Sequence, residues 1–340
     1  MKITTADFGL GAKLFTIENK MGMAISFTNF GARVVDWKVN GKSIILGFDS
    51  VQEYVEKDIF PGATVGRIAG RTKDGIVVIN GKTIQLEQND FPQAIHGGLN
   101  PTQSQLWQAE TFEMKDTAGV KYFLKLKDGD GGYPGNLQFT VIHTFNELGE
   151  WKIEYFAVSD KDTVFNPTGH VYFNLNGDAS IPLDNHRLQI AASRYVPLLD
   201  KTEVVRGEIA DVTGTPFDFR ADKLLSEAFA SNDSQITLVD GIDHGFVLDE
   251  VSIDKVQARL SLDDLSISVY TNQPSIVIFT ANFGDLGTIY RGKAEVNHGG
   301  MTFETQVAPG SPQIPELGDI SLKAGNTYHA ETIYKVNIGE

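Results

Sequence analysis

The sequence predicts an all-β protein, a large antiparallel β-sandwich with few short helices. Three observations lead to this prediction: repeated alternation of apolar and polar residues, glycine-containing turn signals between the alternating stretches, and a scarcity of helical periodicity. The chain also lacks a regular succession of strands and amphipathic helices, which argues against a parallel α/β fold.

The alternating stretches are the basis of the strand prediction. In one of them, Val120, Tyr122 and Leu124 alternate with lysines, and two others are centred on Ile153 and Ile267. Successive side chains of a strand point to opposite faces, so this pattern is typical of antiparallel strands with one buried and one solvated face.

Two turn signals join neighbouring stretches. Asn40-Gly41 and Asn80-Gly81 each lie between apolar residues, and this dipeptide readily adopts the positive φ angles of tight hairpin turns. We therefore expect a hairpin at both positions. Helices are predicted only at residues 50–59 and 221–230, and both are expected to be short.

Length and composition limit the domain organisation and the partners. We expect a single domain over residues 1–340, because the chain has no Pro/Ser-rich linker, low-complexity tract or fixed-period repeat. The contents of 41% hydrophobic and 21% charged residues are typical of a soluble globular protein. A net charge of -15 disfavours nucleic acid and anionic membranes as partners and suits a neutral ligand. The oligomeric state stays open between a monomer and a homodimer.

Other features bear on location and cofactors. Residues 1–7 lack a signal-peptide pattern and no later segment approaches membrane-spanning length, so we expect a cytoplasmic protein. The absence of cysteine rules out disulfides and cysteine nucleophiles. The seven histidines form no His-x-His or His-Glu-x-x-His spacing, and nucleotide-binding signatures are absent, so we expect neither a catalytic metal nor a cofactor.

The most informative segment is Asn-Pro-Thr-Gly-His-Val-Tyr-Phe-Asn-Leu at residues 166–175. If the chain is extended here, His170 shares a face with Tyr172 and Asn174, whereas the alternate residues are apolar and point into the core. The polar face has more hydrogen-bonding capacity than a dry core tolerates. We therefore interpret His170 as a candidate proton carrier, with a structural histidine as the alternative.

A second stretch, Met-Thr-Phe-Glu-Thr-Gln-Val at residues 301–307, divides in the same way. Glu304 lies on the polar side with Thr302 and Gln306, while the other side is anchored by apolar residues. A lone glutamate is usually a solvated surface carboxylate. Together with a histidine on another anchored strand, however, Glu304 forms a pair that can give and take protons.

Several further residues are candidates for ligand binding. His96 precedes two glycines that let the backbone approach another group closely. Arg67 and Arg71, an even number of residues apart, would lie on one side of an extended chain and could hold hydroxyl or carboxylate groups. Asp243 lies in a glycine-bounded turn, and Phe279 either stacks on a ligand or fills the core. A plain turn, a surface ion pair and a capped loop are the alternatives.

The order of these segments along the chain resembles the aldose 1-epimerase family, also called galactose mutarotases. The resemblance runs from the Gly-Arg and His-Gly-Gly segments, through Asn-Pro-Thr-x-His-x-Tyr-Phe-Asn-Leu, to Asp-His and Glu-Thr-Gln, and so spans nearly the whole chain. It implies a large β-sandwich with an open sugar cleft, and an isomerase that acts on free aldohexoses such as galactose and glucose.

The resemblance also implies roles for individual residues. By similarity, Glu304 is the base, His170 is the acid and His96 is a further contact near the ring oxygen of the sugar. Arg71 and Asp243 hold sugar hydroxyls.

The sequence departs from the family pattern at two positions. Gly70 and Gly169 stand where family members usually carry asparagine, each directly before a site residue. Both departures bear on substrate preference or loop rigidity, and both leave the proton-transfer pair intact.

Exchange of anomers requires proton transfer without a redox step. The C1 hydroxyl loses a proton while the ring oxygen gains one, the ring opens, and reclosure after rotation about C1-C2 gives the other anomer. With reference pKa values of about 4.3 for glutamate and about 6.5 for imidazole, we expect the ionised glutamate and the protonated imidazole to coexist between these values. A bell-shaped dependence of kcat/KM on pH follows.

Two alternative functions stay open. A hexose-phosphate epimerase on a similar sandwich would need a phosphate site rich in arginine or lysine. A sugar-binding domain without catalysis could keep the same cleft, since a fold does not guarantee a reaction. The sequence does not indicate which aldose is preferred.

Overall fold

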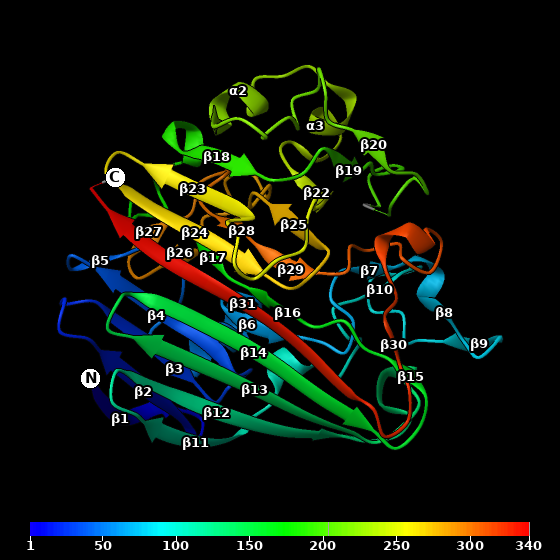
Figure 1. The fold of residues 1–340 in the computed structure, drawn as a ribbon, viewed down its shortest axis with the longest axis horizontal. Helices are drawn as coiled ribbons and strands as arrows, with labels where there is room; N and C mark the ends of the chain where they lie inside the picture. Colours follow the sequence, from blue (N-terminus) through cyan, green and yellow to red (C-terminus); the bar gives the residue numbers. More distant parts are fainter. Residues whose placement is uncertain (203, 340) are drawn as a thin grey trace.

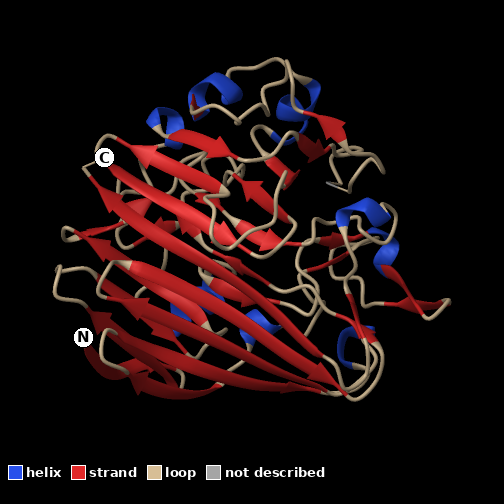
Figure 2. Cartoon of the chain, viewed as in Figure 1, coloured by secondary structure: helices blue, strands red, loops and turns tan. Residues whose placement is uncertain are grey.

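The computed structural model describes residues 1–202 and 204–339 and is built mainly from antiparallel β-strands (Figures 1 and 2). Within these ranges the α-helices are α1 (Val51–Glu56), α2 (Leu225–Phe229) and α3 (Ser234–Val239). None of these described helices has the length and apolar character needed to cross a membrane. The predicted all-β class with few short helices is confirmed.

The largest layer is a nine-stranded antiparallel sheet with the strand order β11-β12-β13-β14-β31-β24-β23-β18-β21. The bounds, in that order, are Gln108–Glu113, Thr117–Leu126, Leu137–Asn146, Glu150–Ser159, Thr327–Ile338, Leu265–Thr271, Ala258–Leu262, Arg187–Ile190 and Lys223–Leu224. Strand β31 runs through the middle of the sheet and pairs with β14 on one side and β24 on the other (Figure 1). It therefore joins the two halves of the sheet.

Two five-stranded antiparallel sheets share a core with this large sheet. The first runs from β1 to β5, with bounds Lys2–Gly9, Ala12–Glu18, Ala24–Thr28, Arg33–Val39 and Lys42–Ser43. The second has the order β20-β19-β22-β25-β29, with bounds Ala210–Asp211, Arg194–Val196, Asp243–Val247, Ser275–Phe279 and Glu304–Gln306. This second sheet supplies most of the strand residues of the cleft described below.

Short two-stranded ladders complete the structure. Three of them position residues of the cleft: β6 (Ala63–Val65) with β16 (Thr168–His170), β7 (Arg71–Thr72) with β10 (Ala94–Ile95), and β17 (Tyr172–Phe173) with β28 (Met301–Thr302). The others are β8 (Ile76–Ile79) with β9 (Lys82–Gln85), β15 (Thr163–Val164) with β30 (Ser321–Leu322), and β26 (Ile289–Tyr290) with β27 (Lys293–Ala294).

The core confirms the predicted alternation. Val120, Tyr122, Ile153 and Ile267 are all buried in one large cluster that also contains apolar residues of both five-stranded sheets. A period of two brings these side chains to the inner face of the large sheet, where the smaller sheets cover them.

Both predicted hairpins are present. Asn40 and Gly41 join β4 to β5 with φ angles of 51° and 76°, and Asn80 and Gly81 join β8 to β9 with φ angles of 51° and 73°. Two successive positive φ angles give the turn a twist that matches the strands it connects. The dipeptides therefore act as the sequence predicts.

The helices fall inside or beside the predicted segments. Helix α1 lies within residues 50–59, where the Ser50 side chain accepts a hydrogen bond from the Glu53 N-H, and α2 lies within residues 221–230. Helix α3, which has six residues like α1, is not predicted. Its first turn is capped by Asp233, whose side chain accepts from the Gln235 N-H.

A buried polar chain links the large sheet to the first five-stranded sheet. The Trp151 Nε1-H donates to His143 Nδ1 at 3.1 Å, and His143 Nε2 lies 3.0 Å from the carbonyl oxygen of Ala32, just before β4. Since Nδ1 accepts, Nε2 carries the proton and donates to that carbonyl. Burial lowers the pKa of His143 to about 4, so the ring is neutral at physiological pH.

Trp151 and Trp37 allow the energetic contribution of this chain to be measured. Both indoles are fully buried and pack edge to face, but Trp37 Nε1 has no hydrogen-bond partner among the described residues. Trp151→Phe should therefore lower the free energy of unfolding by about 1–3 kcal/mol more than Trp37→Phe, because it leaves His143 Nδ1 unsatisfied. Urea unfolding of the two variants measures the difference, and equal losses would show that the chain contributes nothing beyond ring packing.

Candidate active site

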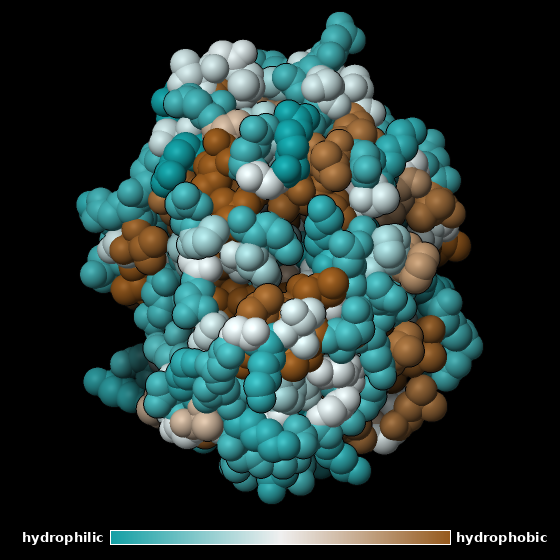
Figure 3. Space-filling model, turned by 90° about the vertical axis from the view of Figure 1, so that its right-hand side faces the viewer, coloured by the Kyte–Doolittle hydropathy of each residue, from teal (hydrophilic) through white to brown (hydrophobic). Residues whose placement is uncertain are grey.

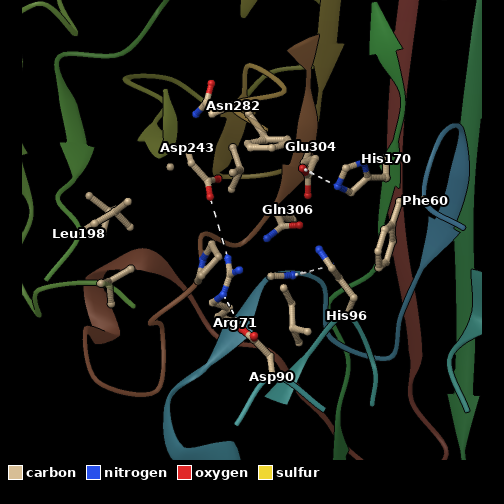
Figure 4. A pocket seen from close by; sticks show the side chains of 18 of the residues that line it. Phe60, Arg71, Asp90, His96, His170, Leu198, Asp243, Asn282, Glu304 and Gln306 are labelled. Atoms are coloured by element: carbon tan, nitrogen blue, oxygen red, sulfur yellow. Dashed lines mark hydrogen bonds and ion pairs between the residues drawn. The ribbon is translucent and has the colours of Figure 1, made fainter. Parts of the chain in front are cut away.

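A cleft of about 470 Å³ brings the predicted site residues together (Figure 4). The residues proposed from the sequence that line it are Arg71, His96, His170, Asp243, Phe279 and Glu304. Figure 3 shows the side of the molecule that carries β7, β10 and β20, where apolar residues surround a hollow near the middle of the face. Segments far apart in sequence thus form one concave site, as is usual for small-ligand binding.

The centre of the site is the contact between His170 and Glu304. His170 ends β16, whose partner is β6, and Glu304 begins β29, whose partner is β25. His170 Nε2 and Glu304 Oε1 lie 3.5 Å apart, and the two side chains are only 6% and 5% exposed. A single small ligand in the cleft can therefore contact both groups.

Burial controls the charge of this pair. It raises the pKa of Glu304 to about 7, against the opposing effects of the Thr302 hydroxyl, which donates to Oε1 at 3.1 Å, and of the positive charge of Arg71. Burial also lowers the pKa of His170 to about 4, against the negative charge of Asp58. Both shifts have the same cause, because a dry environment disfavours a charged carboxylate and a charged imidazole alike.

These pKa values correct one expectation from the sequence. The charged pair was expected between the reference values of the two groups, but in the structure the order of the two pKa values is reversed. Between about pH 4 and about pH 7 the pair holds one proton, and that proton resides mainly on Glu304. The reference pKa values did not predict the charges of Glu304 and His170 correctly, because they describe side chains in water and these two side chains are buried.

His96 lies beside the pair with its ring orientation fixed. Its Nδ1 accepts a hydrogen bond from the Gly70 N-H at 3.2 Å, and its ring centroid lies 5.4 Å from that of His170. Burial holds the pKa of His96 well below its usual value, so the ring is neutral. Gly97, which follows His96, allows two backbone segments of this chain to approach each other closely, rather than a backbone segment and a ligand. A Cβ on Gly97 would lie 1.9 Å from the Gly66 carbonyl oxygen.

Arg71 and Asp243 face each other across the cleft. Arg71 Nε donates to Asp90 Oδ2 at 2.8 Å, and Arg71 Nη1 lies 3.9 Å from Asp243 Oδ2. The guanidinium is therefore held between two carboxylates. Asp90 lies in a loop without periodicity, so its role could not be predicted from the sequence pattern.

Arg67 does not share this position, and the prediction that both arginines lie on one side is wrong. Arg67 is buried and donates to the carbonyl oxygens of Lys127, Pro134 and Gly135. These hydrogen bonds hold the glycine-rich loop of residues 127–135 in place. The prediction assumed an extended chain, but Gly70 has a φ of 79° and turns the backbone before Arg71.

Phe279 and Tyr172 form an aromatic wall of the cleft. Their ring centroids lie 6.1 Å apart, and Phe279 also lies 6.5 Å from the His170 ring. Phe279 is half-buried and packs on a hydrophobic cluster. Phe279 therefore makes the predicted core contact and also lines the cleft, and its stacking on a ligand stays a prediction.

Asn174 is not among the described residues that line the cleft, although it was predicted on the face of His170. Its amide nitrogen donates to the carbonyl oxygens of Asp178, Ile181 and Gly299. The alternation is interrupted because β16 and β17 are separate short strands in different ladders. Asn174 therefore stabilises the turn that follows.

Asp58 is a functional neighbour that the sequence did not reveal. Its carboxylate accepts hydrogen bonds from the Phe60 N-H at 2.9 Å and from the Tyr290 hydroxyl at 3.3 Å. Its negative charge acts on His170 and favours the imidazolium form. No periodic pattern singles out a carboxylate in such a loop.

A possible cation site lies elsewhere. Among the described residues, the ligand atoms close enough to share a metal ion belong to Glu154, His329 and Glu331 on β14 and β31, outside the cleft. Glu154 already pairs with Lys152 at 2.8 Å and with His329 at 3.6 Å. The Glu154–His329 contact joins two neighbouring strands and is typical of cross-strand charge pairing, whereas Lys152 lies on the same strand as Glu154.

Comparison with known proteins places these features in context. The family model described as aldose 1-epimerase matches residues 13–335. The galactose mutarotase of Mus musculus is 34% identical over 310 residues, which cover 90% of this chain and 87% of the relative. The aldose 1-epimerase of Escherichia coli K12 is 32% identical over 341 residues, which cover 97% of this chain and 96% of the relative.

Solved structures give the same result. The crystal structure of galactose 1-epimerase from Lactobacillus acidophilus superimposes with a TM-score of 0.90 at 32% identity, covering 100% of this chain and 99% of that one. An aldose epimerase homologue from C. elegans superimposes with a TM-score of 0.86 at 25% identity and covers both chains completely.

Gly70 can be tested as a position that requires glycine. A Cβ there would lie 2.4 Å from Pro309 Cγ, in addition to the strain of a φ of +79°. We expect Gly70→Ala to destabilise the protein more than Gly22→Ala, where φ is +77° but nothing lies within 4 Å of the added carbon. The backbone cost common to both is about 1–2 kcal/mol.

Pro309→Ala supplies the second arm of this test. It removes the ring atom at 2.4 Å and keeps the Pro309 Cβ at 3.3 Å, so the Gly70→Ala cost measured in that background should fall toward that of Gly22→Ala. Chemical denaturation of the wild type, the three single variants and the double variant gives the free energies of unfolding. A cost that Pro309→Ala does not reduce would contradict the role of this contact.

Proposed function

This chain belongs to the aldose 1-epimerase family and is an isomerase of the mutarotase class, and we propose that it interconverts the α and β anomers of free aldohexoses such as galactose and glucose. The observation that carries the proposal is the 3.5 Å contact between His170 and Glu304 on the wall of the cleft. Two proton carriers that can reach one monosaccharide are what anomer exchange requires.

In the proposed reaction, Glu304 takes the proton of the C1 hydroxyl. The electron pair of that O-H bond forms the C1 carbonyl, the bond between C1 and the ring oxygen breaks, and the ring oxygen takes a proton from His170. Rotation about C1-C2 then presents the other carbonyl face. In reclosure, His170 removes the proton from the hydroxyl that attacks C1, and Glu304 returns a proton to the carbonyl oxygen.

The reactive charge state forms by transfer of a proton within the pair. The shifted pKa values keep the proton of the pair mainly on Glu304, and the reaction needs it on His170. The charges of Asp58 and Arg71 favour this transfer, since Asp58 raises the pKa of His170 and Arg71 lowers that of Glu304. Hydroxyl groups of the bound sugar would further solvate the charged form.

The other residues have proposed binding roles. Because His96 Nδ1 accepts from the Gly70 N-H, its Nε2 carries the proton and is the atom available to donate near the ring oxygen. Arg71 and Asp243 hold sugar hydroxyls, and Phe279 packs against the C-H face of the ring. These contacts exist before the chemical step, so they act mainly on KM.

We further propose a single catalytic domain, active in the cytoplasm in hexose and galactose metabolism as a monomer or homodimer. A chain without cysteine suits a reducing compartment. The net charge of -15 disfavours nucleic acid and anionic membranes as partners, which leaves the small sugar.

The cleft favours a free hexose over a hexose phosphate. Among the described residues that line it, Arg71 is the only arginine or lysine, and it lies between the carboxylates of Asp90 and Asp243. A phosphate group would meet a site whose positive charge is already balanced. Rates on free and phosphorylated hexoses separate the two functions.

Polarimetry tests the proposal directly. After crystalline α-galactose or α-glucose is dissolved, the protein should accelerate the change in optical rotation beyond the uncatalysed drift. Glu304→Gln should lower kcat by roughly two to four powers of ten, because the amide keeps the shape but takes no proton. Glu113→Gln, an exposed glutamate outside the cleft, is the matched control. An inactive wild-type protein that still binds sugar would be a binding protein.

His170→Asn tests the proposed acid separately. We expect a loss in kcat with little change in KM, because the proton donor acts in the transition state. Unchanged turnover would assign the acid to another group, with His96 as the first candidate.

The pH dependence follows from the one-proton state of the pair. A second proton, bound below about pH 4, removes the base, and loss of the shared proton above about pH 7 removes the acid. We expect kcat/KM to be bell-shaped with limbs near these values, after the uncatalysed rate is subtracted at each pH. A rate that continued to rise above the upper limb would show that no protonated residue is needed.

A further inference from the structure

Gln306 occupies the centre of the cleft without an assigned role. It follows Glu304 by two residues on β29, so both side chains point to the same face. Figure 4 shows its amide between Glu304, Arg71 and His96. The residue is completely buried by the surrounding protein and yet lines the cleft.

The amide of Gln306 is satisfied at one end only. Its Nε2 donates to the carbonyl oxygen of Ala69 at 3.4 Å, which fixes which end of the amide is the acceptor. Its Oε1 has no hydrogen-bond partner among the described residues. A buried amide oxygen without a partner is destabilising, so a hydrogen-bond donor that enters the cleft is favoured at this position.

The neighbourhood determines what that donor is. The guanidinium of Arg71 is engaged by Asp90 and Asp243, and Glu304, in the ionised form that the proposed reaction needs, only accepts hydrogen bonds. An uncharged hydroxyl of the ligand fits this acceptor.

Building on the proposed function, we propose that Gln306 Oε1 accepts a hydrogen bond from one sugar hydroxyl other than the C1 hydroxyl and so contributes to the choice of aldose. The C1 hydroxyl is engaged by Glu304, and the ring oxygen has no proton to donate. The bond forms at the dry end of the site, where a sugar that lacks the hydroxyl leaves the amide oxygen unpaired.

Gln306→Met tests the assignment, because methionine keeps the length of the side chain and removes the amide. On galactose we expect kcat/KM to fall about ten-fold. The same variant is then assayed on the 2-, 3-, 4- and 6-deoxy derivatives. On one of them the loss should disappear, because the contacted hydroxyl is already missing, and that sugar identifies the hydroxyl.

Gln103→Met is the matched control. Gln103 is also buried, donates through Nε2 to the His96 carbonyl oxygen and has an Oε1 without a partner among the described residues, but it does not line the cleft. Any loss that it causes is structural and should be the same on every sugar. A Gln306→Met loss of equal size on all five sugars, or no loss, would overturn the inference.

The role of Gln306 and the proposed mutarotase activity can fail separately. If the wild-type protein accelerates mutarotation but Gln306→Met shows no sugar-dependent effect, only the role of Gln306 fails. If the wild-type protein accelerates none of the sugars, the proposed function fails, and calorimetric titration with the same five sugars tests the role of Gln306 in binding. Equal weakening on every sugar would then overturn it.

Discussion

The dry contact between a carboxyl group and an imidazole is the constraint on which the rest of this structure depends. Burial raises the pKa of Glu304 and lowers that of His170, so the pair resists charge separation until a polar ligand arrives. A surface pair would be fully charged before binding and would be screened by water. In the proposed mechanism the acid and the base lie within reach of each other's proton, while Asp58 and Arg71 favour the charged form of the pair that the reaction requires.

The sandwich makes this contact possible by anchoring both partners from behind. The apolar neighbours of His170 and Glu304 along the chain lie in the main core, and the Tyr334 hydroxyl of β31 donates to the carbonyl oxygen of Phe303 at 3.0 Å. The catalytic strands are only three residues long, so their own ladders hold them weakly. The position of the site is thus set by core packing, and the close-packed core keeps the residues of the cleft rigid.

The local sequence pattern was sufficient to predict much of the fold and most of the residues that line the site. The long alternating strands, the Asn-Gly hairpins and the polar faces around His170 and Glu304 depend on neighbours in sequence, which a period of two displays directly. The roles of Arg67, Asp90 and Asp58 depend instead on segments that meet only in the folded chain, and Asn174 left the cleft because two short strands change ladders. The reversed pKa order could not be predicted, since desolvation is a property of three-dimensional packing.

The position of β31 has a consequence for how the protein is made. This strand lies between β14 and β24, and the residues that it pairs precede it by as many as 185 positions in the chain, as in the pairing of Glu150 with Lys335. Until residues 327–338 have left the ribosome, the two halves of the large sheet present unpaired edges to each other and to other chains. Folding of the sheet is therefore completed after synthesis of this strand, and nascent chains that stall before it expose aggregation-prone edges.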